Sequence, residues 1–160
     1  MIRITIVCAG KIKEKYLREG IREYEKRLQR YCKLQWAEVA DERTIENASQ
    51  AQINEIKEKE GQRFAKVIPD NAFVIALDLQ GKMLDSPGLA GKIQNIQVNG
   101  YSHIIFVIGG SVGISDEILK RADFRWSFSE LTFPHQLMRL ILIEQIYRSF
   151  RIINNEPYHK

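Results

Sequence analysis

Residues 106–115 read FVIGGSVGIS, an apolar stretch that runs into a glycine-rich turn and then into the start of a helix. The apolar run begins at residue 104 and continues without a polar side chain to residue 108. Such a run is typical of a strand that is buried on both faces of a parallel sheet. Ser115 and the two acidic residues after it supply a cap and favourable charges for a helix N-terminus. The stretch therefore predicts a central strand, a sharp turn and a short helix.

The same alternation of strand and helix covers the rest of the chain. The predicted strands are residues 3–9, 34–39, 73–77, 104–108 and 125–128, and the predicted helices are 13–31, 50–68, 86–98, a short one from 115, and 134–153. Helices between successive strands favour a mostly parallel sheet with helices on both faces. We therefore expect the α/β class, with about five strands, in a single domain spanning residues 1–160.

Composition agrees with a globular domain that folds without crosslinks. The chain has 160 residues, of which 44% are hydrophobic and 28% charged, so it can bury a sizeable core. Cys8 and Cys32 are too few and too far apart to suggest a metal cluster or a disulfide framework. The sequence shows no signal peptide and no span of about 18 apolar residues. We therefore expect a cytoplasmic protein with reduced thiols and no membrane partner.

The charge is unevenly distributed. The net charge is +4, but the first thirty residues hold nine Lys or Arg against four Asp or Glu. This excess suggests an anionic partner, although a solvated helix face of alternating Lys and Glu has a similar composition.

The predicted last helix is apolar on nearly every side. Leucine, isoleucine and aromatic residues recur from Leu137 to Phe150 over far more than one stripe. A helix of this kind is either central in its own domain or packed against a second copy of the chain. The position at the end of a small chain favours a homodimer.

Two turns and one loop are candidates for ligand binding, because ligands bind at the carboxyl ends of parallel strands. The glycines at 109, 110 and 113 let backbone approach a ligand, but they match neither the Walker motif nor G-x-G-x-x-G. The stretch LDLQGK at 77–82 and the hydroxyl-rich FSELTFPH at 128–135 also follow predicted strands. Each has a plain alternative: glycines placed for tight turning, charges that are merely solvated, and an ordinary loop.

The three histidines have different contexts. His103 opens a strand and is expected to be structural. His135 lies in the first turn of the last helix, where the helix dipole disfavours a second positive charge and keeps the imidazole neutral. His159 lies in a tail, 154–160, that composition alone predicts to be frayed. No spacing of His, Cys and carboxylates resembles a metal site.

Taken together, LDLQGK, FVIGGSVG, SFSELTFPHQLMRLILIEQIYRSFRI and the final PYHK resemble the ribosomal large subunit methyltransferase H family, which belongs to the knotted SPOUT methyltransferases. The resemblance covers the whole chain, and the last fifty residues are the most specific part. It implies S-adenosylmethionine as the methyl donor and no metal. It also implies N3 of a pseudouridine in helix 69 of 23S rRNA, in the ribosome, as the acceptor. The implied fold is a homodimer with a C-terminal trefoil knot.

The resemblance also implies site residues. Its cofactor contacts carry over to Leu77, Gly109, Phe128, Ser129, Glu130, Leu131, Thr132 and Phe133. Methyl transfer to a ring nitrogen is an in-line displacement in which orientation matters most and a base removes the N3 proton. The candidate bases are His135, His159 and Tyr158, and Arg139 can steady negative charge on the flanking carbonyls.

The tail is expected to become ordered over the active site, with Tyr158 and His159 on the base and Lys160 on phosphate. Asn155 stands where the family commonly has glycine, but asparagine tolerates the left-handed conformation that a turn after a helix needs.

Two other functions remain open from the sequence. A nucleotide-dependent oxidoreductase would use the glycine turn to bind NAD, and a ribosome-binding factor without catalysis would not bind S-adenosylmethionine.

Overall fold

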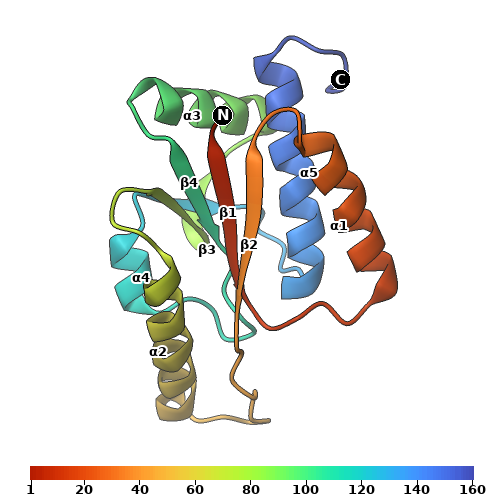
Figure 1. The fold of residues 1–160 in the computed structure, drawn as a ribbon. Helices are drawn as coiled ribbons and strands as arrows, with labels where there is room; N and C mark the ends of the chain where they lie inside the picture. Colours follow the sequence, from red (N-terminus) through yellow and green to blue (C-terminus); the bar gives the residue numbers. More distant parts are fainter.

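A computed structural model describes residues 1–160 as five parallel strands with helices on both faces (Figure 1). The strand order is β2-β1-β4-β3-β5, and every neighbouring pair is parallel. The strands are β1 (Arg3–Ala9), β2 (Lys33–Val39), β3 (Phe73–Met83), β4 (His103–Val107) and β5 (Phe124–Ser127). The apolar run that opened the sequence analysis forms β4, which lies in the middle of the sheet. The predicted fold class and central strand are confirmed.

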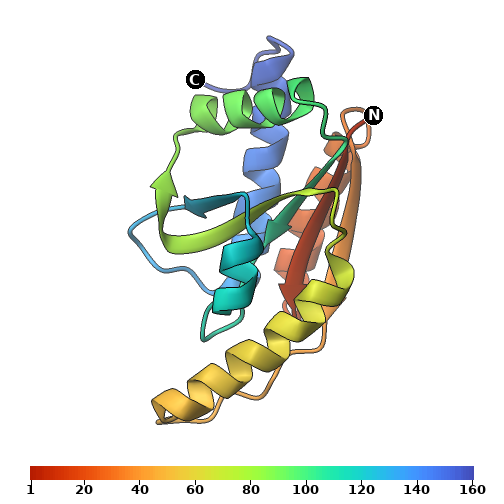
Figure 2. The same ribbon diagram turned by 90° about the vertical axis from the view of Figure 1, so that its left-hand side faces the viewer.

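The helices divide between the two faces of the sheet. They are α1 (Lys15–Leu28), α2 (Gln50–Val67), α3 (Ser86–Val98), α4 (Asp116–Arg121) and α5 (His135–Ile153). Helices α1, α3 and α5 cover one face and α2 and α4 cover the other (Figures 1 and 2). Figure 2 shows that α2 also projects beyond the carboxyl ends of the strands.

Side-chain caps fix several helix starts. Ser49 forms a capping box with Gln52 at α2, and the Ser115 hydroxyl accepts from the Ile118 amide at α4. At α3 the cap is Asp85, whose carboxylate accepts from the Gly88 amide at 2.7 Å.

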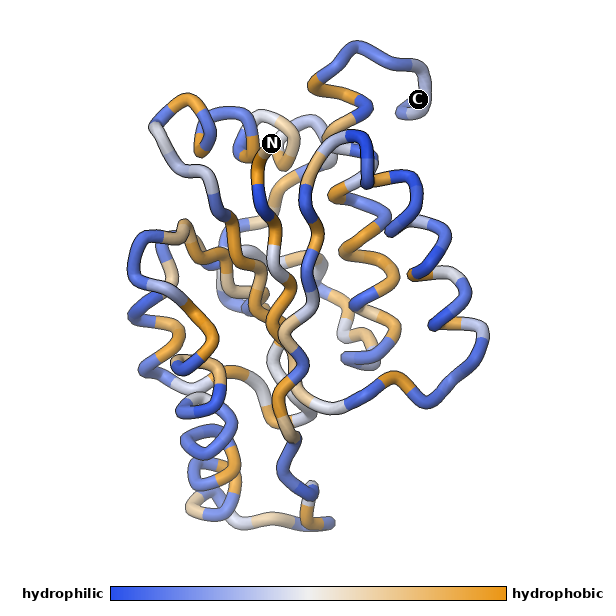
Figure 3. The backbone as a smooth tube through the Cα atoms, viewed as in Figure 1, coloured by the Kyte–Doolittle hydropathy of each residue, from blue (hydrophilic) through white to orange (hydrophobic).

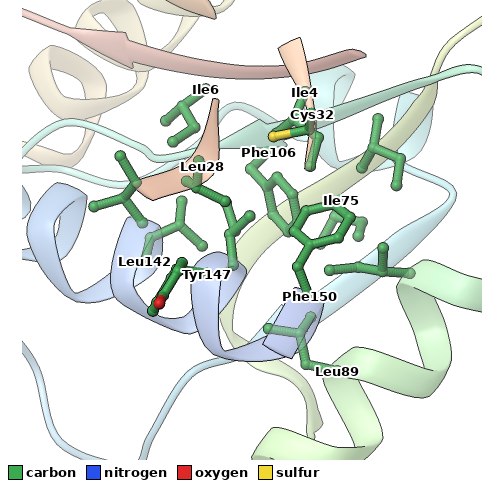
Figure 4. Packing of buried hydrophobic residues seen from close by; sticks show 14 of the residues in the cluster. Ile4, Ile6, Leu28, Cys32, Ile75, Leu89, Phe106, Leu142, Tyr147 and Phe150 are labelled. Atoms are coloured by element: carbon green, nitrogen blue, oxygen red, sulfur yellow. The ribbon is translucent and has the colours of Figure 1, made fainter. Parts of the chain in front are cut away.

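Alternating side chains of the strands build two cores. On β4, Ile104 and Phe106 face the helices α1, α3 and α5, whereas Ile105 and Val107 face α2 and α4. The larger core is drawn in Figure 4, and Figure 3 shows the apolar strands between more polar outer helix surfaces. This arrangement explains why β4 carries no polar side chain after His103.

Helix α5 finds its apolar neighbours within its own chain. Its residues Leu142, Ile143 and Ile146 are completely buried against the sheet, α1 and α3. Gly20 on α1 allows a close approach, since a β-carbon there would lie 3.0 Å from Leu140 Cδ1. The all-round apolar character of α5 therefore has an explanation that does not need a second copy of the chain.

Strand β3 differs from the sequence prediction. It does not end in a turn at residue 77 but continues to Met83, with a register irregularity in which Leu77 and Lys82 both pair with Trp126 on β5. A β-carbon at Gly81 would lie only 2.5 Å from the Arg125 carbonyl carbon, so this close approach of two backbones requires glycine. The polar side chains of LDLQGK hid the continuation because they end the apolar run.

The C-terminal tail is ordered against the end of α5. Asn155 adopts a left-handed φ of 53°, as predicted for this position. The carboxylate of Glu156 accepts from Tyr31 Oη at 2.8 Å and from Arg151 Nη1 at 2.7 Å. The tail is therefore not frayed. No helix in the structure has the length and apolarity that a membrane crossing requires.

Phe106→Ala should lower the free energy of unfolding by about 3–5 kcal/mol, because it empties the centre of the larger core. Denaturant unfolding measures the change. The control is Val98→Ala, since Val98 is 79% exposed and its loss should shift the free energy by no more than about 0.5 kcal/mol. Equal effects of the two substitutions would contradict the placement of the core.

Candidate cofactor pocket and active site

A cavity of about 580 Å³ opens beside the irregular part of β3 and beyond the ends of β4 and β5. Its walls come from the irregular part of β3, the glycine turn after β4, and the segment that joins β5 to α5. All three segments were predicted as strand-end turns or loops, and the structure brings them together. The lining residues are Leu77, Asp78, Leu79, Ile108, Gly109, Gly110, Ser111, Val112, Gly113, Ile114, Phe128, Ser129, Leu131, Thr132, Phe133, Pro134, His135 and Met138.

The glycine turn closes on itself. The Gly113 amide donates to the Gly110 carbonyl at 3.1 Å, and Gly113 has a φ of +95°. A β-carbon at Gly109 would lie 2.7 Å from Ile114 Cγ1 and 2.9 Å from the Gly113 carbonyl carbon. Glycine at 109 is thus required by the turn itself, which was the plainer of the two interpretations of the sequence. The turn still presents bare backbone to the cavity.

The segment between β5 and α5 is held by aromatic packing and short-range hydrogen bonds. Phe128 packs on Trp126 with ring centroids 5.1 Å apart and on Phe133 at 6.3 Å. The Ser129 hydroxyl accepts from the Leu131 amide at 3.0 Å. Of the predicted contacts in this segment, only Glu130 does not line the cavity, and its side chain is exposed to solvent.

His135 is the one predicted proton acceptor that lines the cavity. It is the first residue of α5. Burial and the nearby charge of Arg139 lower the pKa of the imidazole below its ordinary value of 6.5. The ring is therefore neutral at neutral pH, as predicted, although burial and Arg139 are the causes rather than the helix dipole alone.

Arg139 turns away from this cavity. Its guanidinium is almost completely buried and donates to Glu38 Oε2 at 2.7 Å and to the carbonyls of Ala9 and Gly10 at 2.8 and 2.9 Å. These bonds tie the first turns of α5 to the ends of β1 and β2. Within one chain each terminal nitrogen of Arg139 already has a hydrogen-bond partner, and the predicted role of Arg139 in catalysis stays a prediction.

A second, smaller cavity of about 370 Å³ lies on the other side of Arg139, between α1 and β2. Lys11, Arg18 and Arg22 line it together with two glutamates. The Trp36 indole nitrogen is buried there without a hydrogen-bond partner. Three of the nine basic residues among the first thirty thus line this smaller cavity.

Tyr158 and His159 lie at the opposite end of α5 from His135 (Figure 1). The helix has 19 residues, which at 1.5 Å per residue separates its ends by roughly 28 Å. Tyr158 packs on Tyr147 with ring centroids 4.9 Å apart, and Arg148 covers its ring. Burial raises the pKa of the Tyr158 hydroxyl to about 12, so it stays protonated. The tail is not ordered over the cavity of its own chain.

The candidate stretch LDLQGK supplies Asp78 and Leu79 to the cavity, although from the irregular part of β3 and not from a turn. Sequence reasoning missed Met138, which lies one helical turn beyond His135. The signal that could have found it is its spacing from His135, since residues three or four apart share one face of a helix.

A family model described as "Predicted SPOUT methyltransferase" matches residues 2–159. The chain belongs to the SPOUT methyltransferase family. Enzymes of this family use S-adenosylmethionine, which is therefore the methyl donor of this methyltransferase. The structure contains no group of three His, Cys, Asp or Glu side chains that could hold a metal ion.

Curated relatives agree along the whole chain. The chain is 58% identical over 159 residues to a ribosomal RNA large subunit methyltransferase H from Bifidobacterium adolescentis. It is 55% identical over the same length to the protein of that name from Clostridium kluyveri. Both alignments cover 99% of this chain and 100% of the relative.

One solved structure shares the fold at low sequence identity. A probable methylase family protein from Haemophilus influenzae aligns with a TM-score of 0.56 and 14% identity, over 96% of this chain and 67% of that one.

The match to the family model excludes the oxidoreductase alternative, and it confirms that this chain is a methyltransferase.

The larger cavity suits the donor. Its volume lies within the range of roughly 300–1,000 Å³ that is usual for small-molecule sites. Leu79, Leu131 and Met138 supply apolar surface, the glycine turn supplies bare backbone, and the Asp78 carboxylate supplies one negative charge. Apolar walls for a purine and polar groups for an amino acid match the two halves of S-adenosylmethionine.

Arg139→Ala should lower the free energy of unfolding by about 3 kcal/mol, because two backbone carbonyls and Glu38 lose a buried donor. Glu38→Gln keeps an acceptor and should cost less. Denaturant unfolding and a single-turnover assay of methyl transfer on ribosomes are the measurements. Unchanged stability combined with lost methyl transfer would instead place Arg139 among the groups that touch the substrate.

The low pKa of His135 should make stability depend on pH. Below pH 6.5 the unfolded chain takes up a proton at this histidine more readily than the folded chain does, so stability falls as the pH falls. His135→Gln should reduce this loss in urea unfolding at pH 5 and 7.5. Burial also lowers the pKa of His103. The pH dependence of stability in His103→Gln is therefore measured beside that in His135→Gln, to separate the contributions of the two histidines. An unchanged pH dependence in His135→Gln would contradict the assignment.

Proposed function

We propose that this methyltransferase transfers the methyl group of S-adenosylmethionine to N3 of a pseudouridine in helix 69 of 23S rRNA, in the cytoplasm. The observation that carries the proposal is the 55–58% identity to rRNA large subunit methyltransferases H over their full length. Identity of this extent, without a gap in coverage, argues for the same acceptor. We propose that the donor site is the cavity beside the irregular part of β3 and the ends of β4 and β5.

The proposed chemistry asks little of side chains beyond positioning. The bond between the methyl carbon and sulfur breaks as the bond to N3 forms, and N3 loses its proton. Well-oriented reactants gain roughly 7–11 kcal/mol from orientation, whereas a base contributes a factor of about 10² to 10⁴. Within the same chain, the group that can accept this proton is the neutral imidazole of His135, because it lines the cavity.

The basic hollow next to Arg139 supports an RNA partner. Lys11, Arg18 and Arg22 stand together on the surface between α1 and β2. Three cations in one place attract phosphate and contribute affinity without reading sequence.

We also propose that the enzyme works as a homodimer. The reason is the separation of roughly 28 Å between His135 and the tail along α5, estimated from the helical rise. Tyr158 and His159 cannot reach the cavity of their own chain in this arrangement. A second copy placed antiparallel along α5 brings its own tail to the cavity and completes the site. The trefoil knot of the family is proposed for the segments around the cavity, where residues 108–114 and 128–134 lie together.

The donor assignment has a direct test. Calorimetric titration should show binding of S-adenosylmethionine and none of NAD, and single-turnover assays on ribosomes that lack the modification should show methyl transfer. Ribosome binding without binding of S-adenosylmethionine would instead support a binding factor that does not catalyse.

Deletion of residues 158–160 should leave donor binding within about threefold but slow methyl transfer by at least about 10²-fold, because it removes His159, the alternative to His135 as the base, and the aromatic ring of Tyr158. Mixing separates the two possible sources of the tail. The tail-deleted chain is combined with a full-length Leu79→Arg chain, in which the added side chain obstructs the mouth of the cavity. If a tail serves its partner, the mixed dimer has one complete site and activity returns. If each tail serves its own chain, the mixture stays inactive.

A further inference from the structure

Behind the glycine turn, on the side away from the cavity, lies a buried carboxylate that the proposed chemistry does not use. Glu60 on α2 is only 3% exposed. Its Oε2 accepts from the Glu42 amide at 3.0 Å. Its Oε1 is buried without a hydrogen-bond partner and faces Gly110, where a β-carbon would lie 2.7 Å away. Burying a carboxylate with one oxygen unpartnered costs free energy, so its place against the turn needs an explanation.

One face of α2 supports the whole turn. Residues 57, 60 and 61 share this face, since residues three and four apart lie together on a helix. The Lys57 side chain lies 3.7 Å from where a Gly113 β-carbon would be, and a β-carbon at Gly61 would overlap the Ser115 hydroxyl. Position 60 therefore contacts the start of the turn at Gly110, position 57 its end at Gly113, and position 61 the residue that caps the next helix, Ser115.

The connection from β2 to α2 joins the same support. The hydroxyls of Thr44 and Ser111 are 2.6 Å apart, so this connection also binds the turn directly. Arg63 pairs with Glu42 at 2.9 Å, and Glu42 in turn donates its amide to Glu60. Glu60 thus lies between the glycine turn and the β2–α2 connection, which Arg63 holds through Glu42.

The charges around Glu60 are mixed. Asp41, Glu42 and Arg63 are the charged groups that influence it, and burial is the largest cause of a raised pKa. A carboxyl in such surroundings is suited to hydrogen bonding and to filling space more than to carrying a charge.

We propose that Glu60 is a positioning residue for the donor pocket: its carboxyl, held by the Glu42 amide, is the support against which Gly110 and the glycine turn are set. The inference rests on the proposed placement of the donor in this cavity. It explains why position 110 carries glycine although its φ is not left-handed. Any side chain there would have to displace the carboxyl of Glu60.

The test is a double-mutant cycle on the full-length enzyme. Glu60→Ala should weaken binding of S-adenosylmethionine about tenfold, because the turn loses its support. Gly110→Ala should weaken binding at least as much, because its β-carbon collides with Oε1 of Glu60. In the double variant the collision is gone, so its affinity should equal that of Glu60→Ala alone. Losses that multiply would overturn the proposal, because residues without contact behave additively.

Two further variants separate positioning from general damage. Glu60→Gln keeps the volume and an acceptor for the Glu42 amide, so it should restore affinity to within about threefold of the wild type. Glu58→Gln, on the exposed side of the same helix, should change nothing. In the Glu60→Ala enzyme, KM for S-adenosylmethionine should rise while kcat at saturating donor stays within twofold. Wild-type affinity in Glu60→Ala, or equal losses in Glu60→Gln and Glu60→Ala, would contradict the inference.

Leu79→Arg distinguishes the two proposals. If Leu79→Arg weakens donor binding and Glu60→Ala does not, the pocket is placed correctly and Glu60 has no positioning role. If Leu79→Arg binds the donor as the wild type does, the placement of the pocket is wrong and the inference about Glu60 falls with it.

Discussion

Close approach of backbone at the carboxyl edge of the sheet is the constraint on which the rest of the site depends. Gly81 lets β3 pass against the backbone of Arg125, and this contact shifts the pairing of β3 with β5. Gly109 lets the turn after β4 fold against Ile114. Neither position tolerates a β-carbon without movement of backbone. Both close approaches occur in segments beside the cavity, so the shape of its walls depends on these two glycines.

A buried cation fixes the third wall of the cavity. Arg139 bonds the carbonyls of Ala9 and Gly10 and the carboxylate of Glu38, and so anchors the first turns of α5 to the same edge of the sheet. His135 stands one turn earlier on the helix, and its position follows from this anchor. Arg139, which the sequence suggested for charge stabilisation, therefore holds α5 on the sheet within one chain, and its role in catalysis stays a prediction.

Much of the fold could be predicted because it follows from local patterns. The apolar run at 104–108 identified the central strand, and alternation of strand and helix gave the class. The continuation of β3 could not be predicted, because it depends on a contact between Gly81 and β5 that is distant in sequence. For the same reason the sequence left open whether Asp78 lines a ligand site or is merely solvated. Contacts between segments that are distant in sequence produce no periodic pattern of residues. The turn after the regular strand β4 could therefore be predicted, whereas the irregular part of β3 could not.

The resemblance grouped His135 with Tyr158 and His159, and the geometry separates them along α5. Helix α5 is straight enough to hold both ends apart, and its apolar surface is already covered by α1, α3 and the sheet. The apolar pattern of α5 is therefore no evidence for a dimer, although it was the first argument for one. The stronger argument is that one chain holds a cavity at one end of α5 and an ordered aromatic tail at the other. In the proposed homodimer, a twofold axis across this helix would place each tail next to the other cavity, which is the self-complementary relation of a symmetric dimer.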